Sequence, residues 1–295
     1  MTAPEPVRHA RRRATAIGAT ALLMWSCLAV LATLARAVPP FELVALTFGI
    51  AFILSSGLAL GRGDRLRARD IPLPAWAVGV GGLFGYHFVY FMALRSAPPV
   101  HVNLLNYLWP LFVVVFAALL PGERLRWWHG SGAALGFLGA ALLVTGGGTL
   151  AVERAHLVGY VLALLGAMIW AAYSVASRRL VAVPTRAIGH FCGVTAVLGL
   201  LCHSALETWR WPGGEEWLVV AALGAGPVGA AFFAWDYGVK RGDLRALGAM
   251  SYAVPLLGAL LLAAAGLATL TIWIGVAALL IVGGAALASR DLWWR

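Results

Sequence analysis

The sequence has little charge and none of the short motifs that mark common catalytic sites. Only 12% of its 295 residues are charged and 61% are hydrophobic, which gives a mean hydropathy of +0.86. It contains no Walker A sequence, no H-E-x-x-H zinc motif, no G-x-S-x-G nucleophile motif and no acidic calcium loop. An ATP-driven pump is therefore unsupported. A membrane enzyme or a structural subunit is the weakest remaining alternative, because no nucleophile–base constellation is recognisable.

Cysteine is scarce as well. The three cysteines, Cys27, Cys192 and Cys202, all fall within apolar runs and have no metal-binding spacing. We therefore interpret them as small core residues, and we expect neither a metal nor a cofactor.

Long apolar runs, by contrast, fill most of the chain. A helix of about 20 residues crosses about 30 Å of hydrocarbon, and ten runs are long enough. They are continuous rather than alternating, so we expect an all-α polytopic membrane protein and not a β-barrel. The first run follows three arginines as a signal peptide would, but it is long enough to span and we expect it to be retained. The expected spans are roughly 14–35, 41–60, 73–94, 98–119, 126–146, 156–177, 185–205, 216–238, 243–265 and 269–288.

The net charge of +10 comes from short loops between these runs. This distribution argues against nucleic acid as a partner and follows the rule that basic residues stay on the cytoplasmic side of a membrane. With a cytoplasmic N-terminus, 18 of the 22 Lys and Arg residues lie inside, and only Arg36, Arg95, Arg154 and Arg210 lie outside. We expect both termini in the cytoplasm and a lipid bilayer around the spans.

The chain repeats itself at a spacing of 145 residues. Rare residue types recur at this one offset, including the pairs Trp25/Trp170, Tyr107/Tyr252 and Pro110/Pro255. The repeats, 14–146 and 156–288, hold five spans each. Since five is odd, they must be inverted relative to each other, around a central cavity, as in many alternating-access transporters.

The span 98–119 carries a polar face. Asn103, Asn106, Tyr107 and Pro110 lie at i, i+3, i+4 and i+7, and the repeat places Gly248, Ser251, Tyr252 and Pro255 at the same spacing. Each proline should break its helix and free the carbonyl four residues earlier, at Asn106 and Ser251. We expect both segments to line the cavity and to hinge at Pro110 and Pro255; kinks kept for packing are the alternative.

Two further spans carry candidate site residues. Tyr86, His87 and Tyr90 lie within 73–94, and an intramembrane ionisable group such as His87 is a functional candidate, although a buried histidine bonded to a hydroxyl is also compatible. Trp170 and Tyr173 share a face of 156–177, where Trp170 forms either a packing contact or an aromatic wall.

No Asp, Glu, Lys or Arg lies in the middle of an expected span. Asp236 lies near a span end, close to Lys240, and an ion pair there is favoured over a proton-coupling site. A multiply charged substrate would need compensating charge in the cavity. Hydroxyls, amides, an imidazole and aromatic faces suit a neutral or zwitterionic molecule such as an amino acid.

The segment Asn-Leu-Leu-Asn-Tyr-Leu-Trp-Pro at 103–110, the Tyr86-His87 pair and the inverted five-helix halves resemble the drug/metabolite transporter superfamily (EamA-type). Within it, the chain resembles bacterial YddG-type exporters of aromatic amino acids. The resemblance implies export across the bacterial inner membrane. It also implies a central cavity lined by Tyr86, His87, Tyr90, Tyr107, Trp109 and Trp170, with the kink at Pro110 turning Trp109 inward.

Our leading hypothesis is a secondary transporter that exports amino acids and related small metabolites by alternating access. A multidrug or other neutral-metabolite carrier of the same superfamily is the alternative. The sequence leaves the oligomeric state open, and a monomer is compatible with it.

Overall fold

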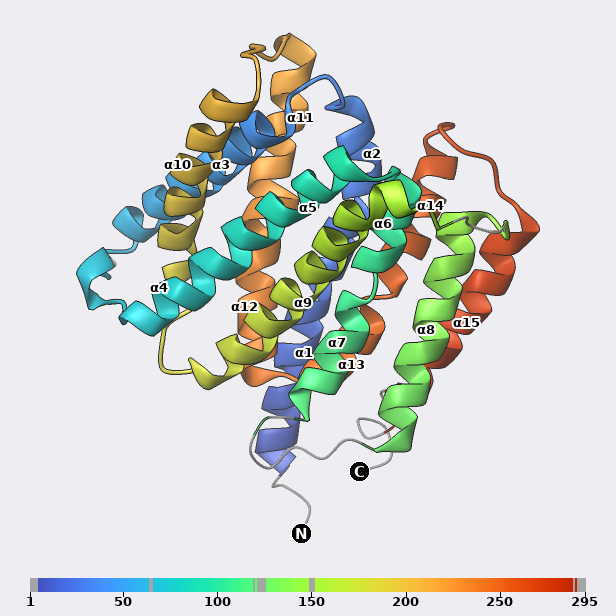
Figure 1. Ribbon diagram of the computed structural model, residues 1–295. Coiled ribbons are helices and arrows are strands. Elements are labelled where there is room, and N and C mark those ends of the chain that lie inside the picture. The colour runs from blue at the N-terminus through green and yellow to red at the C-terminus, as the bar shows by residue number, and fades with distance from the viewer. Residues whose placement is uncertain are drawn as a thin grey trace.

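The computed structural model describes residues 5–63, 66–118, 120, 126–148, 152–288 and 290, and the described chain is all helical (Figure 1). Nine of its helical segments are long and apolar enough to cross a membrane, and the tenth, α15 (Ile272–Ala288), is apolar but has 17 residues. The expected all-α membrane fold is thereby confirmed. Three basic residues that we assigned to the inner side, Arg65, Arg124 and Arg295, lie outside the described residues.

The first half of the chain forms five spans, three of them interrupted. Prolines at Pro40, Pro72 and Pro99 mark helix starts, where the missing N–H costs nothing. The elements are α1 (Glu5–Ser26) with α2 (Leu28–Leu34); α3 (Pro40–Gly61); the short turn η1 (Ala68–Asp70); α4 (Leu73–Val80) with η2 (Gly81–Gly85) and α5 (Tyr86–Ser96); α6 (Pro99–Asn106) with α7 (Trp109–Ala117); and α8 (Trp127–Thr145).

The second half repeats two of these three interruptions, because α9 (Leu157–Arg179), the repeat partner of α1 and α2, is continuous. The elements of this half are the turn η3 (Arg154–His156), α9, α10 (Ala187–Leu206), α11 (Gly214–Ala225) with η4 (Gly226–Ala230) and α12 (Ala231–Arg241), α13 (Leu244–Met250) with α14 (Ala253–Ala264), and α15. Adding 145 to the bounds of η2 gives those of η4, and both are π-helical turns. Such turns contain one displaced hydrogen bond and often lie at functional positions.

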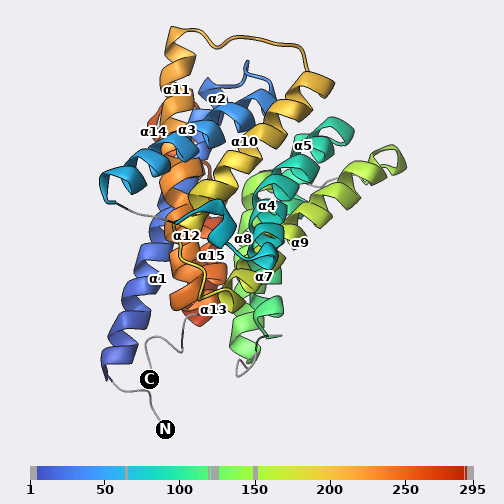
Figure 2. The same cartoon turned by 90° about the vertical axis from the view of Figure 1, so that its left-hand side faces the viewer.

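The two halves are inverted and interlocked. In Figure 1, α1 rises from the lower end of the molecule, whereas its repeat partner α9 descends toward that end. Repeat partners also pack on each other: α3 lies along α10, in front in Figure 2, and α8 lies along α15, as Figure 1 shows. Glycine makes the second contact close, because a β-carbon added at Gly132 would lie 2.4 Å from the carbonyl oxygen of Gly284.

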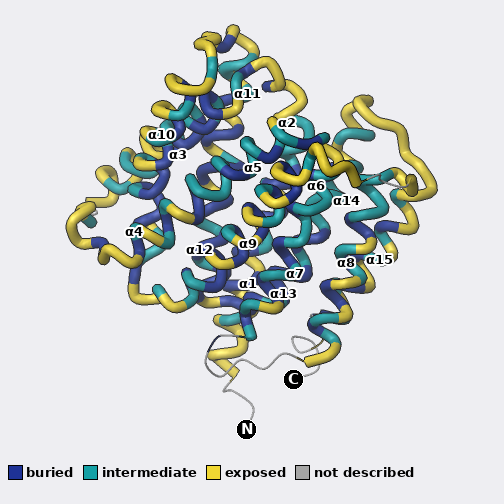
Figure 3. The backbone as a smooth tube through the Cα atoms, in the orientation of Figure 1, coloured by how far each residue is buried: buried dark blue, intermediate teal, exposed yellow. Residues whose placement is uncertain are grey.

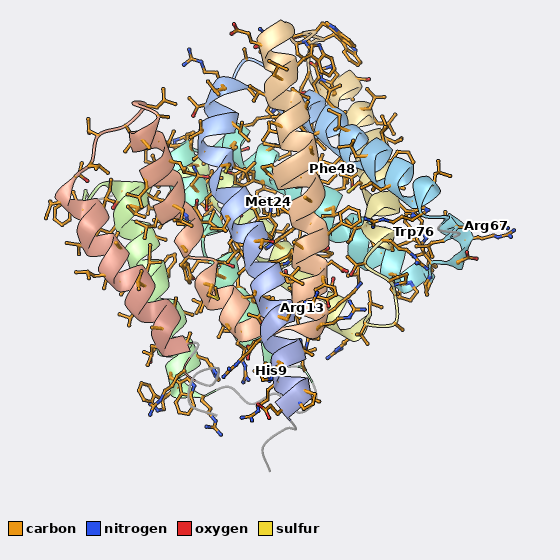
Figure 4. All side chains as sticks on the ribbon, turned by 180° about the vertical axis from the view of Figure 1, so that it is seen from behind. His9, Arg13, Met24, Phe48, Arg67 and Trp76 are labelled. Atoms are coloured by element: carbon orange, nitrogen blue, oxygen red, sulfur yellow. The ribbon has the colours of Figure 1, made fainter. Side chains whose placement is uncertain are left out.

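Close helix packing closes the lower half of the molecule. Figure 3 shows buried backbone where α1, α9, α12 and α13 cross, and a β-carbon added at Gly18 of α1 would lie 2.9 Å from the Cα of Gly238. Arg11 forms a 2.7 Å ion pair with Asp243 and thereby ties α1 to the start of α13. Seen from behind, His9 and Arg13 lie near the lower end of α1, and Met24, close to the other end of this helix, lies about halfway up the molecule (Figure 4).

A buried ionic cluster holds the upper ends of α3, α5 and α10 together. Glu207 receives the backbone N–H groups of Phe41 and Glu42, at 3.1–3.2 Å, and so caps the first turn of α3. The same carboxylate lies 2.9 Å from Nδ1 of the fully buried His203 and 3.1 Å from Arg95. The carboxylate therefore bonds one helix end, the buried His203 and the exposed Arg95 at the same time.

Candidate functional site

A cavity of about 590 Å³ lies between the two halves. It extends from the middle of the molecule to its upper end, where α2 and α14 end in Figure 1. Ala32, Leu143 and Leu262 line its upper part, and Ala32 is exposed. Tryptophan rings that are at least nine-tenths buried lie at its inner end. The cavity thus has one open end and one closed end.

Three tryptophans, Trp25, Trp109 and Trp170, form the floor at the inner end, and a fourth, Trp235, packs on all three without lining the cavity itself. All six centroid distances among these rings lie between 5.2 and 6.4 Å, mostly in edge-to-face or tilted arrangements. Aromatic pairs at such distances attract each other through their quadrupoles, beyond simple apolar burial. Neither Trp25, which we noted only as the repeat equivalent of Trp170, nor Trp235 was among our expected site residues.

The polar wall of the cavity comes from the first half. Asn106 donates from Nδ2 to the hydroxyl of Tyr86 at 3.1 Å, and the hydroxyl of Tyr90 donates to Oδ1 of Asn103 at 2.6 Å. The rings of Tyr86 and Tyr90 stack, with centroids 5.7 Å apart. Oδ1 of Asn106 is buried without a hydrogen-bond partner, which is costly unless a ligand or water donates to it.

His87 completes this wall. Its Nδ1 lies 2.7 Å from the carbonyl oxygen of Leu83, within the π turn η2, so Nδ1 carries a proton and donates it. The ring packs edge to face on Phe48 and Tyr86, each at 5.1 Å between centroids. The histidine is thus bonded to a backbone carbonyl and not to a neighbouring hydroxyl.

Eight of the eleven substrate-binding residues expected from the sequence line the cavity: Tyr86, His87, Tyr90, Asn103, Asn106, Tyr107, Trp109 and Trp170.

Tyr173, Ser251 and Tyr252 do not line it; they are buried in the closed lower half. An offset of 145 relates these three to Leu28, Asn106 and Tyr107, all of which do line it. Inversion explains the difference, because equivalent residues of the two halves face opposite ends of the molecule and only one end is open.

The helix breaks coincide with the proline positions of the repeat. Two turn residues, Tyr107 and Leu108, separate α6 from α7, and two more, Ser251 and Tyr252, separate α13 from α14. Pro255 lines the cavity, whereas Pro110 is buried beside it. One expectation is wrong: the carbonyl of Ser251 is not free, because it accepts the N–H of Val254 at 3.1 Å.

The repeat offset points to the aromatic residues that sequence analysis missed. Trp235 is the repeat equivalent of Tyr90, and Phe232 is that of His87. Phe232 lines the cavity and stacks on Phe48, with centroids 5.6 Å apart. Mapping the candidates of one half onto the other would have found both.

No Asp, Glu, Lys or Arg is present among the described residues that line the cavity. Asp236 and Lys240 of α12 do not line the cavity but form a buried 2.9 Å ion pair in the closed half. Lys240 also donates to the carbonyl oxygen of Val183 at 2.9 Å. The ion pair favoured from the sequence is therefore present, and the cavity offers only uncharged donors, acceptors and ring faces.

Comparisons with known proteins agree with this architecture. Residues 13–145 and 157–290 each match the EamA-like transporter family. The chain is 51% identical, over 95% of its length and 98% of the relative, to the aromatic amino acid exporter YddG of Ancylobacter novellus. It is 26% identical, over 94% of its length and 97% of the relative, to the protein of the same name in Escherichia coli.

A solved crystal structure extends the agreement to three dimensions. It aligns with a TM-score of 0.91 at 50% identity and covers 95% of this chain and 99% of that one. A probable terminal-alkyne amino-acid exporter of Streptantibioticus cattleyicolor is 26% identical over 79% of this chain and 81% of its own. Because both halves match the family and the fold agrees throughout, the chain belongs to the EamA-like transporter family.

Proposed function

We propose that the chain exports aromatic amino acids across the bacterial inner membrane by alternating access, with the described cavity as the binding site. The composition of the cavity carries this proposal: an uncharged wall of tyrosine and asparagine stands over a floor of tryptophans. Its volume of about 590 Å³ lies within the range of roughly 300–1,000 Å³ that is usual for small-molecule sites. The relatives named as amino acid exporters support the same substrate class.

The cavity suggests how such a substrate lies. The ammonium group would donate to the unpartnered Oδ1 of Asn106 and lie against the faces of Tyr86 and Tyr90, which attract cations. The carboxylate would accept from uncharged donors such as the hydroxyl of Tyr107. The aromatic side chain would rest on the floor against Trp109 and Trp170.

Tyr173, Ser251 and Tyr252 belong to this scheme as residues of the opposite conformation. All three are buried in the closed half, where they would face a cavity opened from the lower end. The two halves, 14–146 and 156–288, would move against each other about the breaks near Pro110 and Pro255.

The arginine distribution sets the orientation in the membrane. With both termini cytoplasmic, the lower end of the molecule is the cytoplasmic end and the cavity faces outward. All described residues that line the cavity come from a single chain, which supports a monomer as the transport unit. Reporter fusions in the loops after Arg36 and after Arg62 test the orientation, because only the first should lie outside.

Counterflow in liposomes tests the substrate. Purified protein should exchange labelled tryptophan, tyrosine or phenylalanine, and Tyr107→Ala should slow that exchange while the variant stays folded. Competition by hydrophobic cations would instead indicate a multidrug carrier. Absence of amino acid flux under any gradient would refute the proposal.

A further inference from the structure

Trp25 and Trp170 are repeat equivalents, but they are bonded differently. Their rings meet edge to face at the floor of the cavity, with centroids 5.5 Å apart. The indole N–H of Trp25 donates to the carbonyl oxygen of Pro227 at 3.0 Å, and this contact is buried. The indole N–H of Trp170 donates to no acceptor among the described residues, and its ring lines the cavity. The pseudo-twofold symmetry is therefore broken at this pair.

The carbonyl of Pro227 lies in the π turn η4, and its repeat equivalent, the carbonyl of Gly82, lies in the π turn η2. These two carbonyls are also bonded differently. In η4, the backbone N–H of Ala231 donates to the carbonyl oxygens of Gly226 and Gly229 and not to that of Pro227. The carbonyl oxygen of Pro227 accepts from the indole N–H of Trp25 instead. In η2, the N–H of Tyr86, the equivalent of Ala231, bonds to the carbonyl of Gly82, the equivalent of Pro227. One carbonyl is thus released to a tryptophan, while its counterpart is held by its own helix.

The different bonding of the two tryptophans accompanies a difference between the two ends of the cavity, of which the upper is open and the lower is closed. Ala32 of α2 lines the open end and is exposed, whereas its equivalent in α9, Ser177, is 3% exposed in the closed end. An inverted repeat reaches its opposite conformation when the two halves exchange their arrangements. A bond present on one side in this conformation then has a counterpart on the other side in the opposite one.

We propose that the two tryptophans form an exchanging pair of hydrogen bonds that selects the open end. Trp25 holds the carbonyl of Pro227 while the upper end is open, and Trp170 holds the carbonyl of Gly82 while the lower end is open. The carbonyl that is released returns to the backbone N–H four residues later, at Ala231 or Tyr86. The number of bonds stays constant, but each state has one indole hydrogen bond that only it makes, which is what a two-state element requires.

Trp25 and Trp170 are on this account positioning residues of the transport cycle as well as lining residues. The inference rests on the proposed alternating access, but it requires no assumption about the substrate. A substitution that removes only one of the two indole donors should shift the population of states in a direction set by which tryptophan is changed.

Cysteine accessibility measures that population without any substrate. In a protein with Cys27, Cys192 and Cys202 replaced by alanine, a single cysteine is introduced by Ala32→Cys or by Ser177→Cys. Alkylation by a small maleimide is then followed in lipid nanodiscs. The Ser177→Cys protein reacts only when the lower end opens, so its rate reports the minor state.

The two tryptophan variants should act in opposite directions. One buried hydrogen bond corresponds to a shift of about fivefold in the equilibrium. Trp25→Phe should therefore raise the alkylation rate of the Ser177→Cys protein by about that factor, and Trp170→Phe should lower it similarly; the Ala32→Cys protein should respond in the reverse sense. Trp127→Phe, at a site that is 66% exposed, is the control and should change neither rate.

Equal signs for both variants, or no change in either, would overturn the inference. Should a variant fail to fold, hydrogen exchange of the indole N–H groups in the unmodified protein gives a second test. Trp25 should exchange slowly and Trp170 rapidly, and equal rates would overturn the inference as well. No amino acid takes part in either measurement, so their failure would leave the substrate assignment standing.

Discussion

Replacing Asn106 by leucine should separate binding from stability. The side chain lies at the end of α6, is 7% exposed and lines the cavity. Its Nδ2 donates to Tyr86, but its Oδ1 is buried without a partner. Leucine has nearly the same shape and removes both polar atoms, so the structural and ligand-binding contributions of this amide can be measured apart.

The expected effect on stability is small or favourable. Losing the bond to Tyr86 costs about 1 kcal/mol, while removing an unsatisfied buried acceptor returns about 1–3 kcal/mol. The free energy of unfolding should therefore stay constant or rise by up to about 2 kcal/mol. Thr195→Val is the matched control, because Thr195 also buries an unpartnered oxygen but lies away from the cavity.

The expected effect on binding has the opposite sign. A hydrogen bond to an ammonium group is worth about 1.5–3 kcal/mol, so Asn106→Leu should raise the Kd for phenylalanine roughly 10- to 100-fold. Titration calorimetry measures the Kd, and thermal unfolding measures the stability; Thr195→Val should change the second alone. A variant that unfolds more easily but binds phenylalanine normally would show that Asn106 is structural and would refute the reasoning.

Three further substitutions test the packing and the buried charges by thermal unfolding. Glu207→Gln should lower stability by about 1.5–3 kcal/mol, because the buried carboxylate that bonds the first turn of α3, His203 and Arg95 is replaced by a neutral amide; an unchanged melting temperature would contradict this. Gly132→Val should separate α8 from α15 and destabilise the protein, whereas Gly130→Val, with nothing within 4 Å of its added β-carbon, should do so much less. Lys240→Met alone should cost about 3–5 kcal/mol by stranding Asp236, and combining it with Asp236→Leu should restore much of the loss; equal damage in the single and double variants would show that the ion pair is not the cause.

The helices and their inversion were predictable because both follow from patterns that a membrane imposes. Apolar runs of span length are required by the hydrocarbon thickness, and the offset of 145 places Pro110 and Pro255 at matching breaks. The π turns were not predictable in the same way. Gly81–Gly85 and Gly226–Ala230 share little beyond glycine, and a single displaced hydrogen bond leaves no periodic signal.

The site was predictable on the side where polar residues interrupt an apolar helix. Asn103, Asn106 and Tyr107 are conspicuous because such groups are costly in a membrane without partners. The floor and the rings packed around it were harder to predict, since aromatic residues such as Trp235 and Phe232 are as compatible with packing as with a site. Which of the expected residues face a cavity together could not be read from the sequence at all, because that depends on which end is open.

The two halves present different side chains to a substrate, and this difference should affect the kinetics of transport. A substrate arriving through the open end meets stacked tyrosines and amides, whereas one arriving from the other end would meet Tyr173, Ser177 and Tyr252. The half-saturating concentrations at the two membrane faces should therefore differ. If no ion is coupled, detailed balance requires the ratio of maximal rate to half-saturation to be equal in both directions, so the face that binds more weakly must turn over faster at saturation.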